Sequence, residues 1–207
     1  MLGHSPKMIF GKRHYKNSSD ERLIELIHKG NTSAFNELFQ RYSQKLLFYF
    51  FRMLGGDKER AQDLLQDIFL KLIEKRGMLA PIKNFSSWIF TVAHNMCKNE
   101  YRNKKVRDIF DTNYDLDSFA DNNSDPGFSF ERPVDRKFFN DVLIKKLNIM
   151  TVGQRSTFLL KFQEGFTIKE ISQILHCSEG TIKSRLFYTT KQLAKTLQAY
   201  NPNAVEV

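Results

Sequence analysis

The segment TIKEISQILHCSEGTIKSRL, residues 167–186, decides the fold of the C-terminal part of this 207-residue chain. Thr167 and Glu170 have the spacing of a capping box, in which each side chain bonds the other residue's backbone amide. Apolar residues at helical spacing then predict a short helix, and the polar segment around Gly180 predicts a tight turn before a longer helix. A short helix, a tight turn and a longer helix form a helix-turn-helix pattern, which favours DNA binding.

The first turns of the longer helix carry side chains suited to contact DNA. In a helix-turn-helix, these turns face base edges in the major groove. The side chains concerned are Thr181, Lys183, Ser184, Phe187 and Tyr188. The candidates for phosphate contacts are Arg185, Lys191 and Lys195. A helical hairpin whose lysines only face water is the alternative interpretation of the same pattern.

Residues 18–107 predict four further helices, because apolar residues recur there at helical spacing between glycine-containing breaks. Ser18 and Glu21 fit a capping box at the start of the first helix, and Thr151 and Gln154 repeat this spacing farther along the chain. The third helix combines a complete apolar face with an acidic surface. No strand pattern is evident, so the sequence predicts an all-α protein.

The fourth of these helices, roughly residues 87–105, has one apolar face and one face that is polar, basic and aromatic. Basic side chains can follow the backbone of a single nucleic-acid strand while aromatic and amide groups receive its unstacked bases. The candidates are Trp88, His94, Asn95, Lys98, Tyr101 and Arg102. A place in the core is an equally good interpretation of Trp88. His94 and Cys97 share a face, but two ligands without partners make a weak zinc site, so we predict no metal.

Charge divides the chain into segments of opposite sign. Residues 1–17 carry a net charge of +4 and predict a flexible basic tail, whereas residues 108–135 carry −7 and predict an acidic linker. Residues 18–107 and 136–207 carry +6 each. Basic modules favour polyanionic partners such as nucleic acid, although solubility alone would also account for such a charge.

Composition narrows the class of protein further. Hydrophobic residues make up 41% of the chain and charged residues 27%, which is a globular balance. The longest apolar run, Leu46–Phe51, is far shorter than the ~18 residues that a membrane span needs, so we expect no membrane insertion. The N-terminus has no apolar stretch of signal-peptide length. We expect a cytoplasmic protein whose Cys97 and Cys177 are reduced thiols.

Two pairs of motifs resemble a known family. The runs DLLQDIFLKL, residues 63–72, and FSSWIFTVAHN, residues 85–95, are similar to region 2 of bacterial RNA polymerase sigma factors. The runs TIKEIS, residues 167–172, and SEGTIKSRL, residues 178–186, are similar to region 4. With both motifs in this order, a short linker and no region 3, the chain resembles the extracytoplasmic-function (ECF) group of the sigma-70 family.

The resemblance implies an all-α fold of two small helical domains. A four-helix region 2 domain would span residues 18–107 and a helix-turn-helix region 4 domain residues 136–200. The acidic linker, residues 108–135, would join them. Tails would occupy residues 1–17 and 201–207. The function implied is that of a sigma factor, which associates with core RNA polymerase and directs promoter recognition, DNA melting and transcription initiation.

The resemblance also assigns partners and site residues. The third helix would bind the β′ clamp of core polymerase through Asp63, Gln66, Asp67 and Leu70, and region 4 would meet the β flap. The non-template strand of the minus-ten element would contact Trp88, Asn95, Lys98, Tyr101 and Arg102. The minus-thirty-five element would contact Thr181, Lys183, Ser184, Arg185, Phe187 and Tyr188. Many relatives carry arginine where Tyr188 stands, so the minus-thirty-five preference does not carry over. An anti-sigma factor is a further expected partner.

Two other classes of function compete with this interpretation. A conventional helix-turn-helix regulator, with an N-terminal module that dimerises or binds a ligand, would bind promoters directly without polymerase. It leaves the aromatic and basic fourth helix unexplained. An enzyme has little support, because the sequence has no phosphate loop, nucleophile elbow or metal-ligand cluster. Asp63 and Asp67 are better explained as exposed acids of a docking helix. We therefore expect no catalytic residue, no cofactor and no small-molecule substrate.

Overall fold

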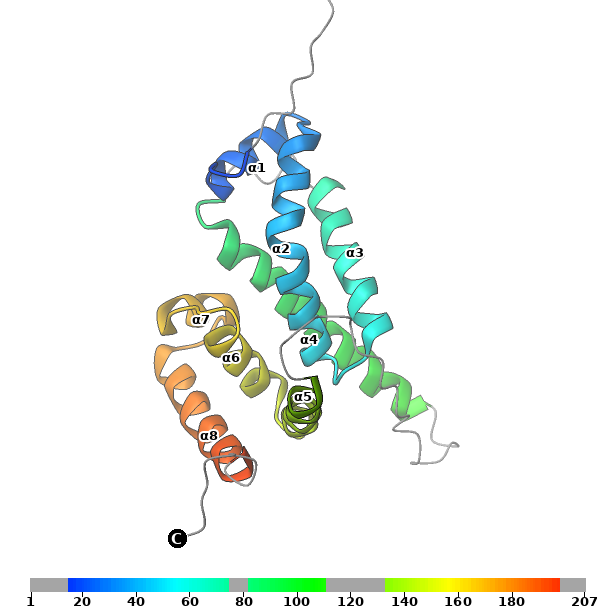
Figure 1. Ribbon diagram of the computed structural model, residues 1–207, viewed down its shortest axis with the longest axis vertical. Helices are drawn as coiled ribbons and strands as arrows, with labels where there is room; N and C mark the ends of the chain where they lie inside the picture. The colour runs from blue at the N-terminus through cyan, green and yellow to red at the C-terminus, as the bar shows by residue number, and fades with distance from the viewer. Residues whose placement is uncertain (1–14, 75–81, 111–132, 198–207) are drawn as a thin grey trace, which may run out of the picture.

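The computed structural model describes residues 15–74, 82–110 and 133–197, and this part of the chain is helical throughout its regular structure (Figure 1). This confirms the predicted all-α class. The described helices are α1 (Asp20–His28), α2 (Thr32–Met53), α3 (Lys58–Glu74), α4 (Phe85–Phe110), α5 (Pro133–Asn148), α6 (Val152–Phe162), α7 (Ile168–Leu175) and α8 (Glu179–Leu197). The C-terminal tail and most of the predicted N-terminal tail and acidic linker lie outside the described residues. None of the described helices is long and apolar enough to cross a membrane.

The start of α1 differs by one residue from the predicted capping box. Ser19 is the N-cap, and its side chain accepts a hydrogen bond from the backbone amide of Arg22 at 3.2 Å. The prediction that Ser18 pairs with Glu21 was therefore wrong. The backbone amide of Ser18 instead donates to the carbonyl of Tyr15 at 2.9 Å, in a turn that precedes the helix.

The other two predicted capping boxes are confirmed. Thr151 and Gln154 cap the start of α6, and Thr167 and Glu170 cap the start of α7, with both reciprocal hydrogen bonds present in each. Each box satisfies amides that have no partner within the helix. The turn between α7 and α8 begins at His176, whose φ of 50° is left-handed and ends α7.

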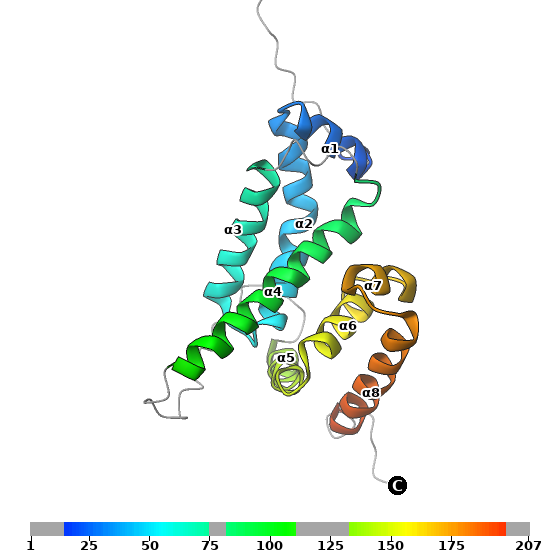
Figure 2. The ribbon, with the colours of Figure 1, turned by 180° about the vertical axis from the view of Figure 1, so that it is seen from behind.

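Helices α1–α4 form an N-terminal helix group around α2. In Figures 1 and 2, α2 lies between α1, α3 and α4, and α4 crosses it. The face of α2 that carries Leu38, Leu46 and Phe50 is fully buried. The ring of Tyr42 meets that of Phe85 edge-on at 5.2 Å, which ties the start of α4 to α2. The apolar residues that recur at helical spacing in the sequence therefore form the core of this helix group.

Helices α5–α8 form a C-terminal helix group that includes the helix-turn-helix. Here α6 packs against α7 and α8. Ile171 and Ile174 of α7 and Ile182 of α8 are completely buried, so the apolar faces of the helix-turn-helix point inward.

Both cysteines of the chain are free, as predicted.

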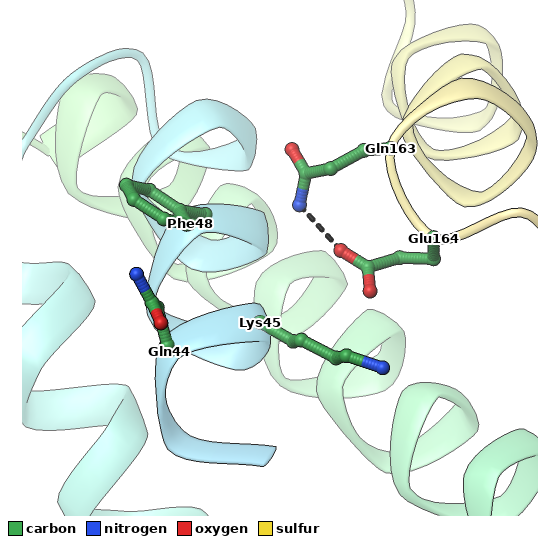
Figure 3. A pocket seen from close by; sticks show the side chains of 5 residues that line it. All are labelled: Gln44, Lys45, Phe48, Gln163 and Glu164. Atoms are coloured by element: carbon green, nitrogen blue, oxygen red, sulfur yellow. Dashed lines mark hydrogen bonds between the residues drawn. The ribbon is translucent and has the colours of Figure 1, made fainter. Parts of the chain in front are cut away.

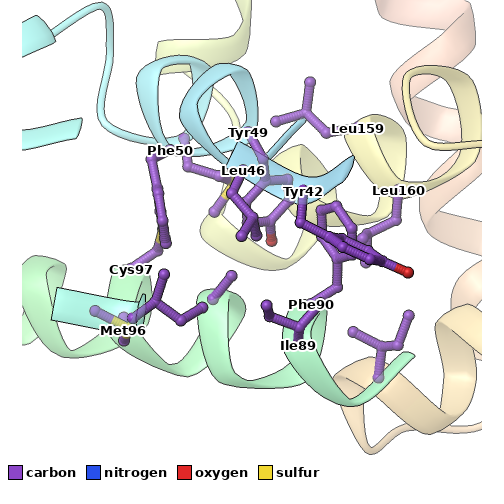
Figure 4. Close-up of a cluster of buried hydrophobic side chains, with 14 of the residues drawn as sticks. Tyr42, Leu46, Tyr49, Phe50, Ile89, Phe90, Met96, Cys97, Leu159 and Leu160 are labelled. Atoms are coloured by element: carbon purple, nitrogen blue, oxygen red, sulfur yellow. The ribbon is translucent and has the colours of Figure 1, made fainter. Parts of the chain in front are cut away.

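The two helix groups pack against each other and share a continuous apolar core. Leu159 and Leu160 of α6 are buried beside Tyr49 of α2 and Phe90 of α4 (Figure 4). The rings of Phe90 and Phe166 meet at 5.3 Å. The sequence predicted two groups of helices joined by a linker, but it did not predict this contact. In both views of the ribbon, α6 and α7 lie beside α4, and α8 lies on the outside (Figures 1 and 2).

Candidate nucleic-acid and protein interfaces

The four residues predicted on the third helix lie together on one exposed stripe of α3. Asp63, Gln66, Asp67 and Leu70 are all exposed, and their spacing of three, one and three residues places them on one helix face. Leu70 is an exposed large apolar residue, with 54% of its surface accessible. The stripe is therefore acidic and partly apolar, which suits a contact with protein better than a contact with phosphate.

Apolar residues that the sequence analysis missed extend this stripe. Ile73, one turn beyond Leu70, and Phe39 of α2 are also exposed. The ring of Phe39 lies 4.7 Å from that of Phe69, which joins the two helices at this surface. Exposed apolar patches of this kind mark interaction sites. The helical period reaches Ile73, but Phe39 comes from another helix and could not be found from the spacing alone.

Helix α4 presents to solvent three of the five residues that the resemblance assigns to minus-ten DNA. Asn95, Lys98 and Arg102 are exposed and lie on one face, at intervals of three and four residues. Two cationic side chains and an amide on one exposed face can contact the backbone and the bases of a nucleic-acid strand.

Trp88 occupies an intermediate position at the start of α4. Its ring is half-buried and lies 5.7 Å from that of Phe85. The start of this helix is capped by Asn84, whose side chain accepts a hydrogen bond from the amide of Ser87 at 2.9 Å. Trp88 therefore supports the core on one side while part of its surface stays accessible.

Tyr101 and His94 point toward the C-terminal helix group. The Tyr101 hydroxyl donates to the carbonyl of Met53 and accepts a hydrogen bond from Arg155 of α6. Burial is the main cause that raises the pKa of Tyr101. The face of α4 that the sequence suggested for nucleic acid is thus divided between solvent and the contact between the two helix groups.

His94 is 9% exposed, and the Nδ1 atom of its imidazole has no hydrogen-bond partner among the described residues. Burial lowers the pKa of His94 to about 4, and the charges of Lys98, Arg185 and His176 act in the same direction. His94 is therefore neutral at pH 7.

Helix α8 presents a separate exposed face on the outside of the molecule. Lys183 and Ser184 are exposed, and Phe187 and Tyr188 each have 61% of their surface accessible. The rings of Phe187 and Tyr188 lie 5.4 Å apart. These aromatic side chains are exposed and lie beside a lysine at the start of the helix. Such an arrangement is suited to enter a groove of DNA.

The other two residues predicted on α8 are partly engaged by the protein itself. Thr181 is half-buried, and its amide donates to Ser178, which caps the helix. Arg185 donates to the Cys177 sulfur at 3.7 Å, and its guanidinium group lies over Gly153, where a Cβ atom would come within 2.9 Å of it. Arg185 is thus turned toward α6 and away from the exposed face.

A hollow marks one edge of the contact between α2 and α6 (Figure 3). Its lining consists of Gln44, Lys45, Phe48, Gln163 and Glu164. Gln163 donates to the carboxylate of Glu164 and accepts a hydrogen bond from Arg52. Burial raises the pKa of Glu164, while Gln163, Lys45 and Arg52 oppose that effect. Polar side chains from both helix groups therefore meet at this edge.

Two family models match this chain, and they fall on the two helix groups. Sigma-70 region 2 matches residues 38–107, and Sigma-70 region 4 matches residues 141–193. Together they cover more than half of the sequence. The chain belongs to the sigma-70 family. This sigma factor therefore directs transcription initiation at promoters, as the resemblance implied.

Curated relatives of this sigma factor match it over most of both chains. The RNA polymerase sigma-H factor of Pseudomonas aeruginosa is 26% identical over 182 residues, which are 86% of this chain and 94% of the relative. The ECF RNA polymerase sigma factor BldN of Streptomyces coelicolor is 25% identical over 190 residues, 90% of this chain and 70% of the relative. These similarities place the sigma factor in the ECF group.

Solved structures support the same fold. CnrH, in complex with the cytosolic domain of CnrY, has a TM-score of 0.64 and 20% identity, over 87% of this chain and 97% of that chain. The sigma factor RpoE, in complex with the anti-sigma factor NepR from Bartonella quintana, has a TM-score of 0.64 and 23% identity, over 79% of this chain and 96% of that chain.

Proposed function

We propose that the exposed stripe of α3 binds core RNA polymerase at the β′ clamp. What supports this is the combination of acids and an uncovered leucine on one face, at Asp63, Gln66, Asp67 and Leu70. The acids repel DNA phosphates, so the stripe favours a basic protein surface. Ile73 and Phe39 would enlarge the apolar part of this interface.

We further propose that the exposed face of α4 captures the non-template strand of the minus-ten element. Asn95, Lys98 and Arg102 would contact the strand directly, and the accessible part of Trp88 would stack on a base. Tyr101 would join them only after its hydroxyl leaves Met53 and Arg155.

The exposed face of α8 is proposed to read the minus-thirty-five element. Lys183, Ser184, Phe187 and Tyr188 would face the major groove. Thr181 would support the helix start. Arg185 would need to turn away from Cys177 to reach DNA. The β flap would meet the same helix group.

The remaining proposals concern organisation and partners. We propose a region 2 domain at residues 18–107, a region 4 domain at residues 136–200 and an acidic linker between them. We also propose a cytoplasmic, non-enzymatic protein without a catalytic centre. RpoE from Bartonella quintana is in complex with the anti-sigma factor NepR in its solved structure, which supports an anti-sigma factor as a partner here.

One observation supports this assignment of surfaces most strongly. The chain carries an exposed aromatic and basic face on α8 and a separate acidic and apolar stripe on α3, within the matches to regions 4 and 2. A conventional regulator needs the first surface but not the second. Pull-down with purified core polymerase tests the assignment, because loss of binding should follow from changes on α3 and not from changes on α8.

A further inference from the structure

Two aromatic side chains lie at the centre of the exposed face of α8. Lys183 and Phe187 are four residues apart, and so are Ser184 and Tyr188, so the four side chains form two neighbouring rows. Each row starts with a polar residue and continues with an aromatic ring one turn later. The buried residues in the described part of this helix lie on its other side: Ile182, Thr189 and Leu193.

The packing of α8 does not depend on the two rings. Phe187 and Tyr188 are each 61% exposed, whereas Ile182 and Leu193 form the buried side of the helix. The two rings together make an apolar patch on the surface, and such patches mark interaction sites. The aromatic pair therefore points to a partner that covers it.

The charges beside the pair favour DNA as that partner. In the row of Phe187, Lys183 lies one turn before the ring and Lys191 one turn after it, and both lysines are exposed. The acidic residue of α8, Glu179, lies in the first turn of the helix, before the row begins. A row of cation, ring and cation matches a groove whose floor is formed by base edges and whose borders carry phosphates.

A phenylalanine ring is suited to one feature of the major groove. Base edges present hydrogen-bond donors and acceptors there, and thymine adds an apolar group, its C5 methyl. The ring of Phe187 neither donates nor accepts a conventional hydrogen bond, so against a polar base edge it would displace water without replacing the lost hydrogen bonds. Against a thymine methyl group it buries apolar surface on both partners. Phe187 therefore favours thymine.

Tyr188 restricts the directions in which the Phe187 ring can point. The two ring centroids lie 5.4 Å apart, and the ring planes meet at 79°. This edge-to-face arrangement is a favourable geometry for an aromatic pair. Because the Tyr188 ring occupies the space on one side of Phe187, it disfavours the rotamers that would turn Phe187 to that side.

The helix geometry relates the base pair at Phe187 to the one at Lys183. Four residues of an α-helix rise about 6 Å. Successive base pairs of B-form DNA are about 3.4 Å apart, so the two side chains reach base pairs about two steps apart. Lysine commonly pairs with the O6 and N7 atoms of guanine. The face therefore favours an element with a guanine and a thymine at about this separation.

We propose that Phe187 recognises the C5 methyl group of a thymine in the minus-thirty-five element, about two base pairs from the pair that Lys183 contacts. Tyr188 positions the Phe187 ring for this contact. The proposal rests on the proposed reading of the minus-thirty-five element by α8, and it adds the base that this helix prefers at one position.

The probe is duplex DNA that the holoenzyme itself selects. The full chain with core polymerase is used to enrich binders from a library with a random minus-thirty-five segment. Deoxyuridine then replaces each thymidine of the selected segment in turn, which removes the methyl group and keeps every hydrogen-bonding atom. At one position the affinity should fall about fourfold, the factor expected for one buried methyl-sized group. A selected segment without enriched thymine, or equal affinity at every position, would overturn the proposal.

Variants of Phe187 assign the methyl preference to this side chain. In Phe187→Ala the thymidine and deoxyuridine duplexes should bind equally, and Phe187→Leu should keep part of the difference. Lys191→Ala is the matched control, because it changes an exposed residue of the same row and should weaken both duplexes by the same factor. Circular dichroism should show unchanged helical content in all three. If the fourfold difference persists in Phe187→Ala, the proposal is wrong.

Variants of Tyr188 test its positioning role. Tyr188→Phe keeps the ring and should keep the fourfold difference between the two duplexes. Tyr188→Ala should reduce that difference without a change in helical content. A purely structural role would weaken both duplexes alike and leave their ratio unchanged, so an unchanged ratio in Tyr188→Ala would exclude the positioning role.

Lys183→Ala separates a failure of this proposal from a failure of the proposed function. If neither Lys183→Ala nor Phe187→Ala changes the minus-thirty-five sequences that the holoenzyme selects, α8 does not read this element and both are wrong. If Lys183→Ala changes the selected sequences but deoxyuridine leaves the affinity unchanged, only methyl recognition is wrong. Loss of core binding in Phe187→Ala would place the aromatic pair on the polymerase and would also overturn methyl recognition.

Discussion

The guanidinium group of Arg155 donates a hydrogen bond to the carbonyl of Met53, the last residue of α2, across the contact between the two helix groups. The carbonyls in the last turn of a helix have no partner within it, so they need one from elsewhere. Here the partner is a residue 102 positions away in sequence. The end of α2 in region 2 is therefore completed by a side chain of region 4.

The stripe on α3 predicts a charge-sensitive contact with core polymerase. Replacing Asp63 and Gln66 with Lys should lower the affinity for core at least tenfold, because both side chains are exposed and face the proposed basic partner. Circular dichroism should show unchanged helical content. Glu25→Lys on α1 is the control and should bind core normally. Equal binding by the double variant would remove α3 from the interface.

The exposed face of α4 predicts a defect in strand separation for Asn95→Ala. The side chain is exposed, so thermal stability should not change, whereas permanganate reactivity of unpaired thymines in the open complex should fall. Trp88→Ala should lower both stability and open-complex formation, because its ring also packs on Phe85. Trp88→Phe should restore much of the stability. Normal open complexes with Asn95→Ala would contradict the assignment.

We predict that two lysines of α8, which lie two turns apart, affect DNA binding in different ways. Lys183→Ala should cost about 1–3 kcal/mol at one promoter position and relax the preference there, as expected for a base contact. Lys191→Ala should weaken all sequences alike and reduce the salt dependence of binding, as expected for a phosphate contact. Competition assays with holoenzyme on single-base promoter variants distinguish them. The assignment fails if both variants lower affinity equally on every sequence.

The lowered pKa of the buried His94 side chain leads us to predict that acid separates the two helix groups. Its pKa is about 4 where the two helix groups are in contact, against an ordinary value of 6.5, so the chain binds fewer protons when the groups are in contact than when they are apart. The contact is therefore fully favoured above about pH 6.5 and loses stability as the pH falls toward 4. At about 1.4 kcal/mol per pH unit, the loss is about 2 kcal/mol at pH 5.

Pulsed electron resonance between spin labels at Lys29→Cys and Lys191→Cys, in a chain with Cys177→Ser, checks this prediction at pH 7.5 and pH 5.0. The fraction of chains with separated helix groups should rise on acidification, because a protonated His94 would face Lys98, Arg185 and His176 in a buried site. His94→Gln cannot gain this proton and should show a much smaller change. Titration of Glu164 is common to both chains and cancels in the comparison. An identical response in His94→Gln would exclude His94 as the cause.

Local spacing explains which features the sequence could predict. The capping boxes at Thr151 and Thr167 depend on residues three positions apart, so they could be predicted without a structure. The stripe on α3 follows from the helical period for the same reason. The N-cap of α1 was predicted at Ser18 instead of Ser19 because two adjacent serines both precede an acidic helix start. The spacing of the residues alone does not show which of the two serines is the N-cap.

Contacts between distant segments explain what the sequence could not predict. Tyr101 had the composition and position of a nucleic-acid residue, but its hydroxyl is engaged by Met53 and Arg155. Arg155 carries no signal in its own helix, because its partners come from three other helices. The pairing of Tyr49 with Ser156 joins residues 107 positions apart. Such pairings depend on how the two helix groups meet, which periodicity does not encode.

Transcription in vitro with purified core polymerase tests the central claim most directly. The account predicts that the chain alone binds promoter DNA weakly and that core alone initiates without selectivity. Core and chain together should initiate at defined start sites, and the Asp63→Lys and Gln66→Lys double variant should not support this. Tight, sequence-specific binding of promoter DNA by the free chain as a dimer, with no change in start sites when core is added, would contradict the account.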